Sequence, residues 1–154
     1  NNHPYYIMSY KDLIKSARKD EELKSDLDIN NIVKETNLEI DLDKMIQNKI
    51  NVLKTLNISN DENSKIMEKL ECYMYIDDVY KFEKGRFIRW INPNNKLMNG
   101  AICVDILFTN MGTNILCKNG CRIFQLKYDI NHFFQLLTEE EQLVLAVNEK
   151  LQYA

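Results

Sequence analysis

The stretch Thr113-Asn-Ile-Leu-Cys-Lys-Asn-Gly-Cys-Arg-Ile-Phe-Gln-Leu-Lys127 decides the fold of the second half of this chain. It contains two runs rich in β-favouring residues, Thr113–Cys117 and Cys121–Lys127, on either side of Asn119-Gly120. An Asn-Gly pair between two such runs is the strongest local signal for a β-hairpin, because both residues tolerate the backbone of a tight turn. The sequence therefore predicts two antiparallel strands here.

Two further strands are predicted upstream of this hairpin. Arg86–Ile91 follows a Lys84-Gly85 turn and is rich in β-favouring residues. Ala101–Phe108 is apolar at nearly every position, which is typical of a strand covered on both faces. Short strands joined by tight turns predict a four-stranded antiparallel meander that curls into a small barrel.

The first 79 residues have the periodicity of amphipathic helices. Helix starts are predicted at Ser9 with Asp12, at Asp41, and at Ser59 with Glu62. The helix after Asp41 has a one-sided apolar stripe, and a second stripe follows Ser59 (Leu42, Met45, Ile46, Ile50, Leu53, Leu56; then Ile66, Met67, Leu70, Tyr73, Met74). A short helix is also expected around Ile32.

The chain is expected to return to helix at its end. His132–Leu137 reads as a short apolar helix, and Thr138 with Glu141 forms a capping box for a last helix that covers an open side of the sheet. The predicted fold class is therefore α+β. Residues 1–79 form a helical region, and residues 80–154 form a small antiparallel β-module with a closing helix.

Charge is unevenly distributed along the chain, although the net charge is only −3. Residues 81–127 contain eight Lys/Arg and two Asp/Glu, whereas the segments on either side are acidic. Seven residues of this basic segment are candidate nucleic-acid contacts: Lys81, Lys84, Arg86, Arg89, Trp90, Lys118 and Arg122. Cations mixed with aromatic residues can bind phosphates and stack on bases.

Strand alternation leaves an alternative open for the same residues. Arg86, Ile88 and Trp90 share one face of their strand, so each face mixes charge with apolar bulk. Trp90, the only tryptophan, is expected to be largely buried under the last helix near Val144 or Val147. In that case the arginines lie at the margins of a buried strand and pair with the acidic helices.

The four cysteines are expected to be mostly reduced core thiols, which indicates a reducing, intracellular compartment. Cys117 and Cys121 would face each other across a three-residue loop and could then hold half of a zinc site. With a two-residue loop, Cys117 would instead pair with Arg122. No cofactor is expected.

No catalytic or phosphate-binding motif occurs in the sequence, so an enzyme is not expected. No apolar run, Ala101–Val104 included, approaches the roughly 20 residues of a membrane span. The amphipathic stripes could instead dock a protein partner or a second copy of the chain. The expected function is that of a non-enzymatic interaction or structural protein, and nucleic-acid binding is the alternative.

Residues 80–127 also resemble a known sequence module. It comprises Phe82-Glu-Lys-Gly-Arg-Phe-Ile-Arg-Trp-Ile91, then Leu97-Met-Asn-Gly-Ala-Ile102, then Ile115-Leu-Cys-Lys118. This pattern is similar to uncharacterised proteins of large nucleocytoplasmic DNA viruses, although Ala101 stands where their second glycine does. The resemblance implies a viral protein with a small β-module, such as a virion or virus-factory component, and it implies no catalytic residues.

Overall fold

The computed structural model describes residues 41–152 and divides them into two compact units. Residues 48–136 form one unit, called the sheet unit below, and residues 41–47 and 137–152 belong to the other. The helices predicted between Ser9 and Val33 lie outside the described residues. Within the described range, no helix is long and apolar enough to cross a membrane.

The sheet unit contains a single antiparallel sheet of six strands in the order β1-β6-β2-β3-β4-β5. The α+β class is thereby confirmed, whereas the predicted count of four strands is wrong. The strands are β1 (Tyr73–Tyr75), β2 (Phe87–Ile91), β3 (Ala101–Thr109), β4 (Gly112–Asn119), β5 (Arg122–Lys127) and β6 (His132–Leu136). A 3-10 turn, η1 (Val79–Lys81), lies between β1 and β2.

The two strands that the sequence did not predict, β1 and β6, pair with each other. Tyr73 and Met74 were assigned to a helical stripe, but three residues are too few for either periodicity to be distinguished. His132–Leu136 was expected to be helical. Its two phenylalanines are buried on opposite faces, Phe133 in one apolar cluster and Phe134 in another, so the run is apolar without alternation.

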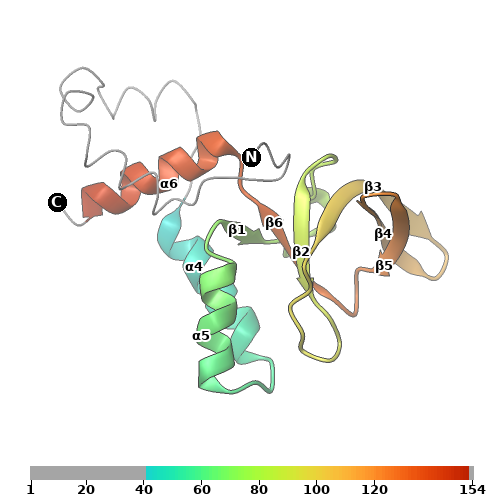
Figure 1. Cartoon of the computed structure of the whole chain (residues 1–154), viewed down its shortest axis with the longest axis horizontal. Helices are drawn as coiled ribbons and strands as arrows, with labels where there is room; N and C mark the ends of the chain where they lie inside the picture. Colours follow the sequence, from blue (N-terminus) through green and yellow to red (C-terminus); the bar gives the residue numbers. More distant parts are fainter. Residues whose placement is uncertain (1–40, 153–154) are drawn as a thin grey trace. The chain divides into compact units, whose positions relative to one another are not determined.

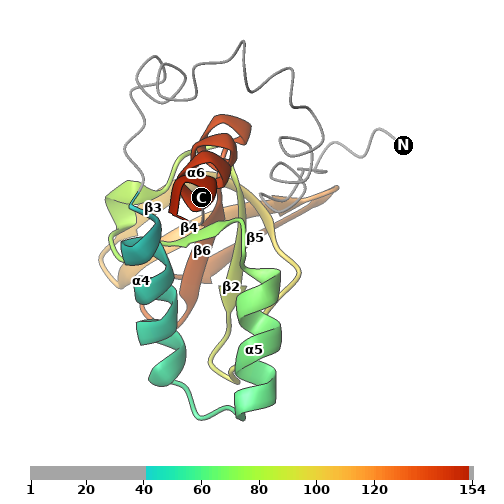
Figure 2. The same ribbon diagram turned by 90° about the vertical axis from the view of Figure 1, so that its left-hand side faces the viewer.

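Helices α4 (Leu42–Lys54) and α5 (Asn60–Lys69) begin where the sequence predicts. The Asp41 carboxylate accepts from the Lys44 amide at 3.1 Å, and the Ser59 hydroxyl accepts from the Glu62 amide at 3.2 Å. Leu53 of α4 and Leu70 after α5 pack together with Ile91 and Phe134 of the sheet. Within residues 48–136, these apolar side chains are therefore part of the core of the sheet unit itself. Figure 2 shows the ribbons of the two helices.

The centre of the sheet is covered on both faces. Ile88, Trp90 and Phe133 point into a cluster on the concave side, while Ile91 and Phe134 lie under the helices. Strand β3 was expected to be doubly covered, and this expectation is wrong. Its Ala101 and Cys103 are buried, but Val104 and Phe108 are exposed.

The sheet is open and strongly coiled, with β1 and β5 as its edges. Strands β3, β4 and β5 curl round at one end of the sheet unit (yellow to orange in Figure 1). The ring of Trp90 on β2 lies 5.9 Å from the ring of Phe124 on β5. In a flat sheet, three strand spacings would separate them by about 14 Å, so the coiling folds β5 back over β2. The predicted meander is present, but it does not close into a barrel.

The predicted capping box at the start of α6 (Glu139–Gln152) is confirmed. The Thr138 hydroxyl accepts from the Glu141 amide at 3.1 Å, and the Glu141 carboxylate accepts from the Thr138 amide at 3.0 Å. The Gln142 side chain, which is fully buried, donates to the Leu137 carbonyl at 3.0 Å. The predicted contact of Trp90 with Val144 or Val147 stays a prediction.

Candidate functional site

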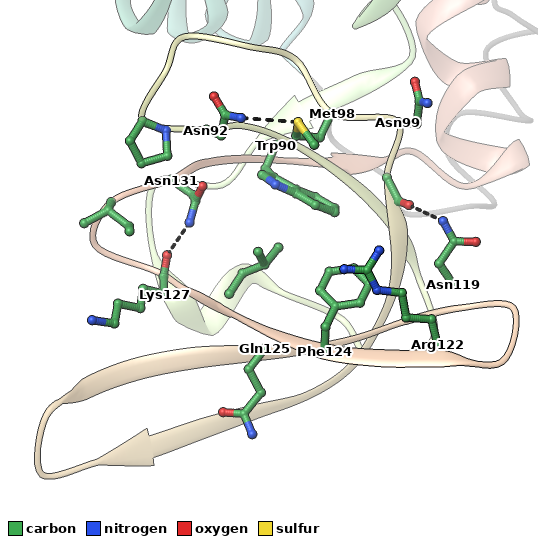
Figure 3. Close-up of a pocket in the computed structure, with 14 residues that line it drawn as sticks. Trp90, Asn92, Met98, Asn99, Asn119, Arg122, Phe124, Gln125, Lys127 and Asn131 are labelled. Atoms are coloured by element: carbon green, nitrogen blue, oxygen red, sulfur yellow. Dashed lines mark hydrogen bonds between the residues drawn. The ribbon is translucent and has the colours of Figure 1, made fainter.

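A cavity of about 650 Å³ opens on the concave side of the sheet, between the β2–β3 loop and the edge strand β5. We call it the mouth (Figure 3). It lies entirely within the sheet unit. Its wall is formed by the loop after β2, by β5, and by the turn after β5 (Trp90, Asn92, Pro93, Met98, Asn99, Gly100, Asn119, Arg122, Phe124, Gln125, Leu126, Lys127, Ile130, Asn131).

Aromatic side chains form the floor of the mouth. Trp90 is only 6% exposed, so its expected burial is confirmed, and its neighbours are the rings of Phe124 and Phe133. Phe124 is half-buried. The guanidinium carbon of Arg122 lies 5.2 Å from the centre of the Phe124 ring, a cation–π arrangement. The floor of the mouth therefore combines an indole, a phenyl ring and a guanidinium group.

The β4–β5 hairpin determines which side chains of β5 face inward. Asn119 pairs with Arg122, which leaves a two-residue loop of Gly120 and Cys121, and Gly120 has a φ of +61°. With this register, Arg122, Phe124 and Leu126 point to the concave side. The side chains of Gln125 and Lys127 point away from Trp90 in Figure 3.

Asparagine amides hold the rim of the mouth in place. The Asn119 side-chain nitrogen donates to the Gly100 carbonyl at 3.1 Å, and that of Asn131 donates to the Lys127 carbonyl at 2.8 Å. The Asn92 side-chain oxygen accepts from the amides of Asn94 and Lys96, both at 3.0 Å, and so shapes the β2–β3 loop. These contacts brace the rim on both sides of the cavity.

The electrostatic character of the mouth is positive. None of its lining residues is acidic. Two of its lining residues, Arg122 and Lys127, are exposed cations, and no carboxylate within residues 41–152 forms an ion pair with them. A third exposed cation, Lys118, lies on the outer face of the neighbouring strand β4. Unneutralised cations beside a concave surface raise the local concentration of anionic ligands.

The predicted basic surface is only partly assembled. Trp90 and Arg122 line the mouth, and Lys118 lies on the outer face of β4. Three other predicted cations form ion pairs: Lys81 with Asp77 at 2.6 Å, Lys84 with Asp105 at 3.0 Å, and Arg86 with Glu83 at 2.7 Å. The Lys84 contact lowers the pKa of Asp105.

Arg89, the remaining predicted cation, is bound to backbone. Its Nε donates to the Met98 carbonyl at 2.9 Å, and burial lowers its pKa. The side chain thus ties the β2–β3 loop to β2. Arg89 therefore has a structural role at the margin of a buried strand, which was the alternative that strand alternation left open. Its partner is a backbone carbonyl, whereas the sequence predicted an acidic helix.

The two cysteines of the hairpin do not face each other. Cys117 is buried and lies opposite Phe124 on β5, whereas Cys121 is exposed in the turn. Neither loop expected from the sequence is formed, because the turn lies one residue further along the chain. Across residues 41–152, no three metal-ligating side chains gather in one group.

Sequence reasoning missed Phe124, Met98 and the asparagines of the rim as site residues. A signal for Phe124 was present, since a two-residue turn after Asn119 places Arg122, Phe124 and Leu126 on one face of the last strand. The asparagines carried no such signal, because they come from three separate turns that only the coiled sheet brings together.

Comparison with known proteins gives no family assignment: no protein-family model, no curated protein and no solved structure matches this chain.

Proposed function

We propose that the protein is a non-enzymatic nucleic-acid-binding module that contacts its ligand through the mouth. The observation that carries this proposal is the arrangement of Arg122, Phe124 and Trp90 in a cavity without a lining carboxylate. Cations that follow a backbone and aromatic rings that accept bases are the two components of nucleic-acid binding without sequence preference.

In this proposal the affinity comes from Lys118 and Arg122, which the sequence predicted as nucleic-acid contacts, and from Lys127, which it did not. Arg86 and Arg89 are committed to Glu83 and to backbone carbonyls, so their replacement would disturb the fold. Lys118, Arg122 and Lys127 are exposed and unneutralised within the described residues, and they lie on adjacent strands. Arg122 points to the concave side, whereas Lys118 and Lys127 lie on the outer face of the same edge, so a single strand that contacts all three has to wrap around the β5 edge.

The test is the salt dependence of binding to a fluorescein-labelled 12-nucleotide DNA, measured by fluorescence anisotropy. For about three phosphate contacts to a single strand, the logarithm of affinity should fall with the logarithm of salt concentration with a slope of about −2. The triple variant Lys118→Gln, Arg122→Gln, Lys127→Gln should abolish this slope and most of the affinity.

A matched control separates site binding from net charge. Lys54→Gln, Lys65→Gln and Lys69→Gln remove the same charge from exposed positions on α4 and α5. This variant should keep most of the affinity and the slope. Equal losses in both triple variants, or no binding at low salt, would overturn the proposal.

One observation favours a second candidate function, self-association. Tyr80 and Phe108 stack with ring centres 6.1 Å apart although they are 80% and 62% exposed, and Met111 nearby on the β3–β4 hairpin is 94% exposed. Exposed aromatic and Met side chains of this kind are typical of interaction surfaces. Sedimentation velocity should detect a dimer that Tyr80→Ser with Met111→Ser dissociates, and a monomer at all concentrations would contradict this function.

A further inference from the structure

We propose that the mouth accepts an unpaired base, which stacks on Phe124, so that the module selects single-stranded over double-stranded nucleic acid. This inference rests on the proposed nucleic-acid binding and specifies its ligand. It starts from the position of Phe124, whose ring lines the cavity, 5.9 Å from the Trp90 ring and 5.2 Å from the Arg122 guanidinium carbon.

The volume of the mouth is sufficient for a single nucleotide. A cavity of about 650 Å³ is within the usual range for sites that enclose a small molecule, so it can admit one nucleotide. In a duplex both faces of each base are covered by stacked neighbours, and extruding a base costs free energy. A flexible single strand can present a base to Phe124 without that cost.

Arg122 can open the stacking face of Phe124. Its guanidinium carbon lies 5.2 Å from the ring centre, whereas a base between the two needs about 7 Å, two stacking layers of about 3.5 Å each. Arg122 is exposed and forms no ion pair within residues 41–152, so its side chain can move outward and cover the second face of the base.

The rim provides hydrogen-bond groups for the edge of the base. The side-chain nitrogens of Asn119 and Asn131 donate to backbone carbonyls, which leaves their amide oxygens as acceptors. Asn99 lines the same cavity and is exposed. Every nucleobase carries an N–H group on its edge, so these amide oxygens can accept a hydrogen bond from any base. A purely apolar ligand could not form this bond.

The experiment compares a labelled 12-nucleotide thymidine strand with a 12-base-pair blunt duplex in 50 mM salt, using fluorescence anisotropy. The single strand should bind at least about tenfold more tightly than the duplex. Phe124→Leu keeps an apolar side chain and removes the aromatic face. It should weaken single-strand binding at least about fivefold, as expected for one lost base stack, and leave duplex binding unchanged.

Two controls make the outcome decisive. Phe108→Leu alters an exposed aromatic residue outside the mouth and should change neither affinity. The single strand should quench Trp90 fluorescence in the wild-type protein, and the duplex should not. This measurement does not depend on the folding of any variant. If strand and duplex bind equally and Phe124→Leu has no effect, this inference is wrong while the proposed function stands. If neither binds, both are wrong.

Discussion

Cys103 on β3 and Cys117 on β4 lie directly opposite each other in the sheet, and neither side chain is exposed. Both thiols belong to the concave cluster together with Trp90 and Ile115. Burial raises the pKa of Cys103 to about 11 and that of Cys117 to about 12, because a thiolate there would lose its hydration. The pair therefore makes the core sensitive to alkaline pH.

The first prediction is that this pair lowers the free energy of unfolding above pH 9. The unfolded thiols release protons near 9 while the folded ones retain them, so stability is fully present below pH 9 and is lost as pH rises toward 11 to 12. Cys103→Ala with Cys117→Ala should flatten this decline, which is at most about 1.4 kcal/mol per pH unit for each thiol. Urea titrations from pH 7.5 to 10.5 test it. An identical decline in the variant would contradict the prediction.

The second prediction is that Lys49 raises the free energy of unfolding as pH rises, which is opposite to the effect of the cysteine pair. It is only 2% exposed, its ammonium donates to the Leu70 carbonyl at 3.0 Å, and burial lowers its pKa from 10.5 to about 8. Between pH 8 and 10.5 the unfolded chain binds more protons than the folded one at this site, so stability should rise with pH.

The difference in unfolding free energy between wild type and Lys49→Met isolates this effect. It should increase in favour of the wild type by about 1 kcal/mol from pH 7.5 to pH 9. Lys54→Met, at an exposed position on the same helix, is the control and should show no such change. A pH-independent difference for Lys49→Met would show that its ammonium is hydrated in the folded protein.

Trp90 should be a major source of packing energy. Trp90→Ala should reduce the free energy of unfolding by about 3–5 kcal/mol, as expected for a large buried aromatic side chain. Phe108→Ala, at a residue that is 62% exposed, should cost far less. Because Trp90 is the only tryptophan, its emission should be blue-shifted and poorly quenched by acrylamide in the folded protein. Readily quenched, red-shifted emission would contradict its burial.

Gly100, at the rim of the mouth, should not tolerate a side chain. Its φ is +107°, and a Cβ there would lie 2.5 Å from the Ile88 carbonyl oxygen and 2.8 Å from the Phe87 ring. Gly85 also has a positive φ, +88°, but nothing lies within 4 Å of its Cβ position. Both alanine variants incur backbone strain of order 1–3 kcal/mol, and only Gly100→Ala adds a clash. Thermal unfolding should therefore show a larger loss for Gly100→Ala, and equal losses would contradict the assigned clash.

Local signals were sufficient to place several elements from the sequence. Asp41, Ser59 and Thr138 each begin a helix, because an N-cap depends on hydrogen bonds within a few residues. The hairpin after β4 was also predicted, although its turn consists of Gly120 and Cys121 and lies one residue beyond the predicted position. The sequence also predicted that Trp90 is buried, since apolar residues flank it in a strand. The α+β class followed from the change of periodicity near residue 80.

Only the tertiary structure decided where the other strands and the mouth lie. His132–Leu136 is a strand because β2 provides an open edge for it, and an apolar run by itself is compatible with either helix or strand. Arg86 and Arg89 resembled ligand contacts until the fold supplied Glu83 and the Met98 carbonyl as partners. The mouth depends on the coiling of the sheet, which brings Phe124 to Trp90 across 34 residues of chain, and such a long-range contact leaves no local trace in the sequence.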